Sequence, residues 1–209
     1  MEILFLLPLL IFSVIFHEVS HGIVAHHYGD DTAYLSGRIT LNPLPHLDPI
    51  GSIIFPAFCF FLHVPVFGWA KPVPVNPSLF TKYRSGVIWV SLAGPLTNFL
   101  IAMVSVVLLY FSVTQSYLIN NFPILPKFLT QAILLNLVLS VFNLFPIPPL
   151  DGSKVLSVLL PRSLARVYDL LEPYGFFIMM ILIVLGVLNQ VLYPVVGWIY
   201  QRMLGVFGL

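Results

Sequence analysis

Long apolar segments dominate this sequence and restrict the folds that it can adopt. Four of them, at about 3–28, 86–113, 128–146 and 173–192, are long enough to cross a bilayer as helices. Hydrophobic residues make up 59% of the chain and charged residues only 8%, whereas about a quarter of a soluble domain is charged. These features predict an all-α polytopic membrane protein with about four to six transmembrane helices, forming a single membrane-embedded domain over 1–209.

Shorter segments between and after these helices have different patterns. Residues 50–64 are apolar but bounded by prolines, and they are too few for a full span, so we expect a re-entrant segment after the first helix. Alternating polar and apolar residues at 32–42 predict a small surface β-hairpin or sheet. The proline-rich stretch 68–77 is expected to be extended, either as a plain loop or beside a bound substrate. The apolar segment 195–209 fits an interfacial helix or a short last span.

The first apolar segment contains a His-Glu-x-x-His pattern, His17-Glu18-Val19-Ser20-His21. Positions four apart lie on one face of a helix, so both imidazoles can bind one metal ion. Glu18 falls beside that face, where a carboxylate can take a proton from a metal-bound water. Ionisable groups in a transmembrane helix are costly, which makes them functional candidates.

Asp151 is the best candidate for a third metal ligand. The prolines at 146, 148 and 149 break the third helix just before it, and a broken helix at membrane depth must be buried in protein or line a wet cavity. Catalytic zinc usually has three protein ligands and one open position, so we expect one zinc ion per chain. The Asp-Gly pair at 151–152 is also a common turn, which is the simpler interpretation.

Buried amides in two other helices are candidates for a role near this site. Asn98 follows Gly94-Pro95-Leu96-Thr97 in the second long helix, and either joins helices or contacts the metal site or a substrate. Asn143 lies at the end of the third long helix, just before its break.

The distribution of basic residues predicts the orientation in the membrane. Lys and Arg gather in the loops at 28–85 and 146–172, while the N-terminus has none, so the N-terminus is expected outside and the two basic loops in the cytoplasm. The His motif and Asp151 then both fall toward the cytoplasmic side. The net charge of +1 gives no basic field that would indicate nucleic-acid binding.

At these residues the chain resembles the site-2 protease family of intramembrane zinc metalloproteases. The resemblance rests on the His-Glu-x-x-His motif, on Gly94-Pro95-Leu96-Thr97-Asn98, and on the stretch Asn143-Leu144-Phe145-Pro146-Ile147-Pro148-Pro149-Leu150-Asp151-Gly152. It implies zinc held by His17, His21 and Asp151, and Glu18 as catalytic acid and base. It also implies cleavage of transmembrane segments of other proteins in the lipid bilayer, and a substrate contact by Asn143. No PDZ or CBS domain fits here, so the chain resembles the minimal members.

Two other functions use the same residues. A non-catalytic metal-binding or transport protein would also bury ionisable groups, although transporters usually show repeated halves with paired broken helices, which this sequence lacks. A metal-dependent hydrolase of small lipidic substrates would need the same zinc. The sequence predicts neither the oligomeric state nor the identity of the substrate.

Overall fold

The computed structural model describes residues 2–62, 68 and 70–209, and this part of the chain is helical without a β-strand. The long helices are α1 (Glu2–His27), α4 (Tyr83–Thr114), α6 (Leu125–Asn143) and α10 (Val187–Val206). Shorter helices are α2 (Thr32–Leu35), α3 (Phe55–Phe61), α5 (Ser116–Asn121), α7 (Asp151–Leu159), α8 (Arg162–Asp169) and α9 (Gly175–Val184). Single turns and other short helical elements are η1 (Leu44–His46), η2 (Pro49–Ile54), η3 (Pro77–Leu79) and η4 (Glu172–Tyr174).

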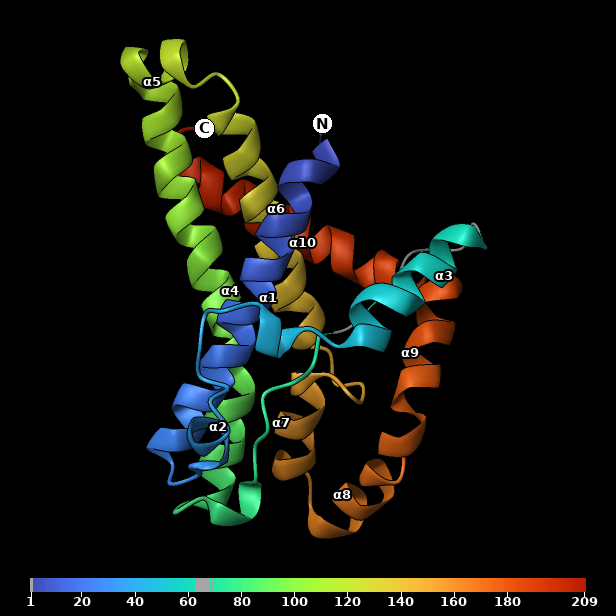
Figure 1. Ribbon diagram of the computed structural model, residues 1–209. Coiled ribbons are helices and arrows are strands. Elements are labelled where there is room, and N and C mark those ends of the chain that lie inside the picture. The colour runs from blue at the N-terminus through green and yellow to red at the C-terminus, as the bar shows by residue number, and fades with distance from the viewer. Residues whose placement is uncertain (1, 63–67, 69) are drawn as a thin grey trace.

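A bundle of α1, α4 and α6 forms the body of the protein, and α10 crosses it obliquely (Figure 1). Its main apolar core joins α4, α6 and α10 through eight buried side chains: Ala102, Val106, Leu109, Leu129, Ile133, Leu137, Leu192 and Val196. Four stretches have the length and composition of membrane spans: Leu6–His27, Tyr83–Thr114, Leu125–Asn143 and Arg162–Val184. The described chain is therefore an all-helical, multi-pass membrane protein, as the apolar segments predicted.

A polar cluster inside the bundle ties its three main helices together. Asn98 in α4 donates to the Asn136 side chain in α6 (2.9 Å) and to the Ser13 carbonyl in α1 (3.2 Å). Asn136 in turn donates to the Ser13 hydroxyl (3.0 Å), and all three residues are almost completely buried. Each such interhelical hydrogen bond contributes about 0.6–2 kcal/mol in an apolar bundle. The cluster fixes the register of α1 against α4 at Ser13, one helical turn before His17 in α1.

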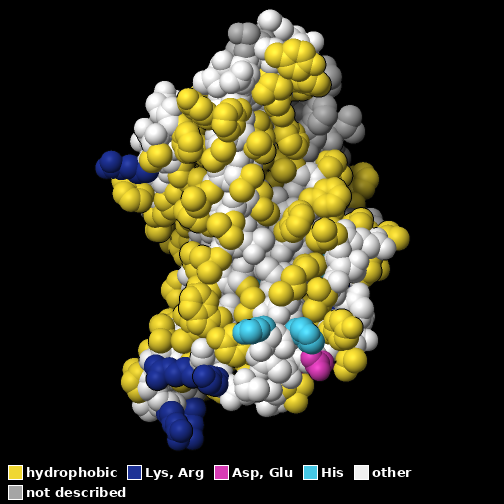
Figure 2. All heavy atoms as spheres, turned by 90° about the vertical axis from the view of Figure 1, so that its left-hand side faces the viewer, with side chains coloured by type: hydrophobic (Ala, Val, Ile, Leu, Met, Phe, Trp, Pro, Cys, Tyr) yellow, Lys and Arg dark blue, Asp and Glu magenta, His cyan; other side chains and the backbone are white. Residues whose placement is uncertain are grey.

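Polar and charged side chains are segregated along the molecule. Figure 2 shows one face on which hydrophobic side chains cover most of the upper part, while basic, acidic and histidine side chains gather toward the lower end. Basic side-chain atoms also appear higher on this face, at its left edge. The apolar band suits the lipid core, and the charged end suits the water interface.

The predicted β-hairpin at 32–42 is wrong. This stretch begins with the short helix α2 and continues as bends and turns. Asp30 accepts hydrogen bonds from the Thr32 backbone N–H (3.0 Å) and from its hydroxyl, which starts a helical turn, and Gly37 ends the turn with φ +65°. The alternation of polar and apolar residues was too short to outweigh these local hydrogen bonds from Thr32 to Asp30.

The predicted re-entrant segment at 50–64 receives no support. Its described part forms η2, a π-helical turn, followed directly by α3, and runs as one helical stretch as far as Phe61. Asp48 starts this stretch by accepting from the N–H groups of Ile50 (3.0 Å) and Gly51 (2.6 Å). No return leg follows within the described residues, and positions 63 and 64 lie outside them.

The helix expected at 173–192 is two helices in the structure. Gly186 adopts a left-handed conformation (φ +70°), so that α9 ends at Val184 and α10 begins at Val187. The segment 195–209 forms the second half of α10 and the residues after it. Glycine adopts this conformation without the steric cost that other residues meet, which allows a sharp change of direction here.

The break between α6 and α7 is closely packed against neighbouring backbone. A side chain on Gly152 would overlap the Leu144 carbonyl, and one on Gly175 would overlap the Pro148 carbonyl. Both glycines therefore allow backbone segments to approach closely. As a result, the first turn of α7 lies against the end of α6 and points Asp151 into the bundle.

Asp30 is a buried acid that ties the chain together just after α1. One carboxylate oxygen accepts from the Thr32 backbone N–H (3.0 Å), and the other accepts from the Asn76 backbone N–H (2.6 Å). Burial alone would raise the pKa of the Asp30 carboxyl, but the hydrogen bonds from Thr32 and Asn76 outweigh it and hold the pKa below its usual range. The ionised form is therefore the one that stabilises the fold.

We expect Asp30→Asn to lower the free energy of unfolding by about 1–3 kcal/mol at neutral pH, because the amide nitrogen would face the Asn76 N–H. The difference from wild type should be complete above the ordinary carboxyl pKa of 3.8 and should shrink as the pH falls below it. Thermal unfolding in detergent at several pH values measures this. Asp31→Asn is the matched control, because it changes a neighbouring carboxyl that is exposed and paired with the exposed His26 ring. A difference between wild type and Asp30→Asn that does not depend on pH would contradict the expectation.

Candidate active site

His17 and His21 lie one helical turn apart on α1, on the face that meets α4. Their ring centroids are 4.7 Å apart, and the two residues are only 7% and 8% exposed. The i, i+4 spacing brings both Nε2 atoms to the same side of the helix. Two imidazoles are thus buried side by side between α1 and α4.

Asp151 meets both imidazoles from the first turn of α7. One of its oxygens, Oδ2, lies 3.1 Å from His17 Nε2 and 3.2 Å from His21 Nε2. The ligand atoms of the three residues all lie within 4.8 Å of one another, and Asp151 is 7% exposed.

The far nitrogen of each imidazole has its own acceptor. His17 Nδ1 lies 2.6 Å from Asn98 Oδ1, and His21 Nδ1 lies 2.6 Å from the Val90 carbonyl oxygen. The amide nitrogen of Asn98 is already used as a donor to α1 and α6, which leaves its oxygen for His17. Both rings therefore carry their proton on Nδ1 and present an Nε2 lone pair toward Asp151, the arrangement typical of metal-binding histidines.

These three groups fit a zinc ion. Two lone pairs and a carboxylate converge on one point, which leaves an unfavourable concentration of acceptors unless a cation lies among them. Ligands of a tetrahedral zinc at about 2.0–2.1 Å are separated by about 3.3 Å, close to the spacings of both imidazoles from Asp151. Gly94 in α4 makes room for the rings, because a side chain there would overlap both imidazoles.

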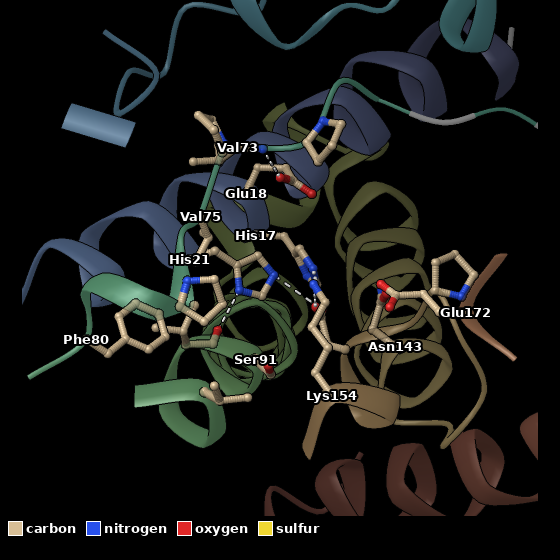
Figure 3. Close-up of a pocket in the computed structure, with 17 residues that line it drawn as sticks. His17, Glu18, His21, Val73, Val75, Phe80, Ser91, Asn143, Lys154 and Glu172 are labelled. Carbon is tan, nitrogen blue, oxygen red and sulfur yellow. Dashed lines mark hydrogen bonds and ion pairs between the residues drawn. The ribbon is translucent and has the colours of Figure 1, made fainter. Parts of the chain in front are cut away.

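Glu18 lies in the same pocket as the three candidate ligands. The pocket has a volume of about 560 Å³, and its wall includes α4, the extended segment Pro72–Val75 and the start of α7. Figure 3 shows Glu18 on the side of this segment, where its Oε2 accepts from the Val73 backbone N–H at 2.7 Å. Glu18 is half-buried, so it is reached by water more easily than the histidines are.

The two asparagines singled out in the sequence have different positions. Asn143 lines the pocket on the side of Glu172 (Figure 3). Asn98 is completely buried behind His17 and does not line the pocket. Its contacts are with the His17 ring and with α1 and α6.

Several contacts of the site could not be read from the sequence. The acceptor for His21 is a backbone carbonyl, that of Val90, and the partner of Glu18 is a backbone N–H, that of Val73. Backbone groups carry no residue type that could indicate such a role. Lys154 could have been noticed three residues after Asp151 in α7, and its Nζ lies 3.7 Å from Asp151 Oδ1.

Comparison with known proteins gives the same assignment as the geometry of the pocket. A family model described as peptidase family M50 matches residues 123–186. The proposed zinc metalloprotease YwhC of Bacillus subtilis (strain 168) is 39% identical over 195 residues, which cover 92% of this chain and 86% of YwhC. The chain belongs to peptidase family M50, the site-2 proteases.

Other relatives carry related names. The proposed zinc metalloprotease Rip2 of Mycolicibacterium smegmatis is 27% identical over 90% of this chain and 70% of its own length. A zinc metalloprotease of Methanocaldococcus jannaschii is 29% identical over 74% of this chain and 34% of its own length. No solved structure matches the chain. This member of the site-2 proteases is thus a zinc metalloprotease with membrane helices, and the alternative of a non-catalytic transport protein receives no support.

Gly94→Ala tests whether the space between α1 and α4 is needed for the metal. The added methyl group would press on both imidazoles and move their Nε2 atoms apart, so we expect zinc affinity to fall at least about 10-fold. Gly197→Ala in α10, where a methyl group meets nothing within 4 Å, should bind zinc as wild type does. Competition with a chelator of known affinity measures both. Equal zinc affinity in the two variants would show that the close approach at Gly94 is unimportant.

Asn98→Ala tests the acceptor behind His17. Without it, His17 can rotate or change tautomer, and zinc affinity should fall by about 10- to 100-fold. Ser105→Ala removes another polar group from α4, but one whose hydrogen bond goes to the Ile101 carbonyl of the same helix, and it should leave zinc affinity unchanged. An Asn98→Ala protein that unfolds at wild-type temperature yet binds zinc as tightly as wild type would contradict the assigned role.

Proposed function

We propose that this site-2 protease hydrolyses peptide bonds within or near transmembrane segments of other membrane proteins, using one zinc ion held by His17, His21 and Asp151. The observation that carries the proposal is the convergence of two imidazole Nε2 atoms on Asp151 Oδ2 at 3.1 and 3.2 Å, with Glu18 in the same pocket. The burial of these groups among membrane-spanning helices supports a substrate that is itself in the membrane.

Glu18 is the proposed catalytic acid and base. Zinc bound at the site supplies a Lewis acid, which polarises a carbonyl and lowers the pKa of a bound water to about 7. The Glu18 carboxylate takes a proton from the attacking water and later gives it to the nitrogen of the cleaved peptide bond. Its half-buried position beside the pocket supports this role, because it can meet both water and substrate.

The remaining residues of the site hold the substrate and the metal ligands in place. Asn143 is the proposed substrate contact, and its place on the pocket wall supports it. Asn98 fixes the orientation of His17 from behind. The basic loops around 28–85 and 146–172 support an orientation with the N-terminus outside and the active site toward the cytoplasm.

Glu18→Gln should lower the rate of peptide cleavage without lowering zinc binding. We expect this variant to keep about one zinc per chain and to cleave a synthetic transmembrane peptide about 100- to 10,000-fold more slowly than wild type, because an amide cannot accept the proton. Zinc content by elemental analysis and peptide cleavage by mass spectrometry measure the two effects. Glu172→Gln makes the same chemical change elsewhere on the pocket wall and should retain most of the activity.

Two outcomes would contradict the proposal. Cleavage by Glu18→Gln at the wild-type rate would exclude Glu18 as the base. Wild-type cleavage that persists after a chelator has removed all zinc would exclude the metal-dependent reaction.

A further inference from the structure

The extended segment Lys71–Asn76, here called the strap, runs along one side of the active-site pocket (Figure 3). Its sequence alternates Pro72, Val73, Pro74 and Val75. Proline has no backbone N–H, so Val73 is the only backbone donor among residues 72–74. That single N–H donates to Glu18 Oε2 at 2.7 Å.

Buried charges hold the strap at both ends. Arg38 Nη2 donates to the Lys71 carbonyl (2.8 Å) and to the Pro72 carbonyl (3.1 Å). Asp30 accepts from the Asn76 N–H (2.6 Å). Arg38 and Asp30 are 8% and 0% exposed. Charged side chains are rarely buried to that degree unless they are paired or hydrogen-bonded, and here the strap backbone supplies hydrogen bonds to both. A third tie comes from the Lys71 N–H, which donates to the His46 carbonyl (2.9 Å).

The strap also packs against the metal-binding helix. Val73 is 6% exposed, and a side chain on Gly22 of α1 would press on its Cγ1. The Val73 N–H is therefore fixed relative to α1 by packing on one side and by the buried charges on the other. A glutamate side chain has three rotatable bonds, so without such a donor its carboxylate would sample several positions around the pocket.

We propose that Arg38 and Asp30 are positioning residues for catalysis: by holding the strap, they make the Val73 N–H orient the Glu18 carboxylate beside the metal ligands. One carboxylate oxygen is occupied by the strap, and the other stays free to exchange a proton with water. The proposal rests on the proposed role of Glu18 as acid and base. It concerns the rate of the chemical step and not zinc binding, because neither Arg38 nor Asp30 touches His17, His21 or Asp151.

The strap donor can be removed by one substitution, and a second substitution controls for the lost side-chain packing of Val73. Val73→Pro deletes the N–H in a stretch that is already extended and proline-rich, while Val73→Ala trims the side chain and keeps the N–H. Arg38→Met removes the guanidinium at similar length, and Arg38→Lys keeps a donor. Arg84→Met, which changes an exposed arginine at the start of α4, is the control for the loss of one positive charge.

The experiment uses the zinc-loaded protein in detergent and a synthetic transmembrane peptide, and it measures kcat, KM and zinc per chain for every variant. We expect Val73→Pro and Arg38→Met to lower kcat by about 10- to 100-fold, with KM within about threefold of wild type and zinc content unchanged. Asp30→Asn should lower kcat by a smaller factor. Arg38→Lys should recover part of the loss, Val73→Ala should keep more of kcat than Val73→Pro, and Arg84→Met should match wild type.

Several results would overturn the inference. Wild-type kcat in a folded Val73→Pro protein would show that the donor is not needed, even if Arg38→Met cannot be folded. A rise in KM with unchanged kcat would assign the strap to substrate binding, and zinc loss in these variants would assign it a general structural role. Glu18→Gln in the same series separates the role of Glu18 from the role of the strap. If Glu18→Gln is fully active, the proposed function of Glu18 fails; if it is inactive while Val73→Pro is normal, only the role of the strap fails.

Discussion

A buried imidazole in an apolar helix bundle needs a partner for each of its nitrogens. This requirement relates the helices that surround His17 and His21. An unpaired polar group in such surroundings costs several kcal/mol. His17 meets Asn98 on one side and Asp151 on the other, and His21 meets the Val90 carbonyl and the same carboxylate. Each Nδ1–H has an acceptor, whereas each Nε2 lone pair faces the Asp151 carboxylate and would be satisfied only by a cation between them. These contacts relate α1, α4 and α7 to one another. The same pairing leaves both Nε2 lone pairs available for a cation.

The proline-rich break after α6 brings Asp151 to the two histidines of α1. Residues 144–150 leave the helix, and Gly152 lets the new helix approach the Leu144 carbonyl, so that Asp151 enters the bundle at the depth of the histidines. Its position in the first turn of α7 also puts its negative charge near the positive end of the helix dipole, which favours the ionised form.

The sequence predicted those parts of this protein that depend on residue type and spacing. The apolar segments indicated the long helices, the i, i+4 histidines indicated a shared metal face, and the prolines before Asp151 indicated a break that could bring it there. It could not predict contacts made by backbone groups, such as those of Val90 and Val73, because any residue supplies them. It was wrong at 32–42, where one buried carboxylate, Asp30, decides the local structure against a weak β pattern.

The polar groups along α1, α4, α6 and the start of α7 differ in their burial. Asn98 and Asn136 are fully buried in the bundle, the candidate zinc ligands are 7–8% exposed, and Glu18 is half-buried beside the pocket. A zinc site enclosed as completely as the asparagines would exclude water, and one as open as the charged end of the molecule would lose the low dielectric that strengthens its interactions. The ligands lie between these limits. The pocket opens beside the candidate ligands on the side of Glu18 and the strap, and the fully buried Asn98 lies on the opposite side of His17.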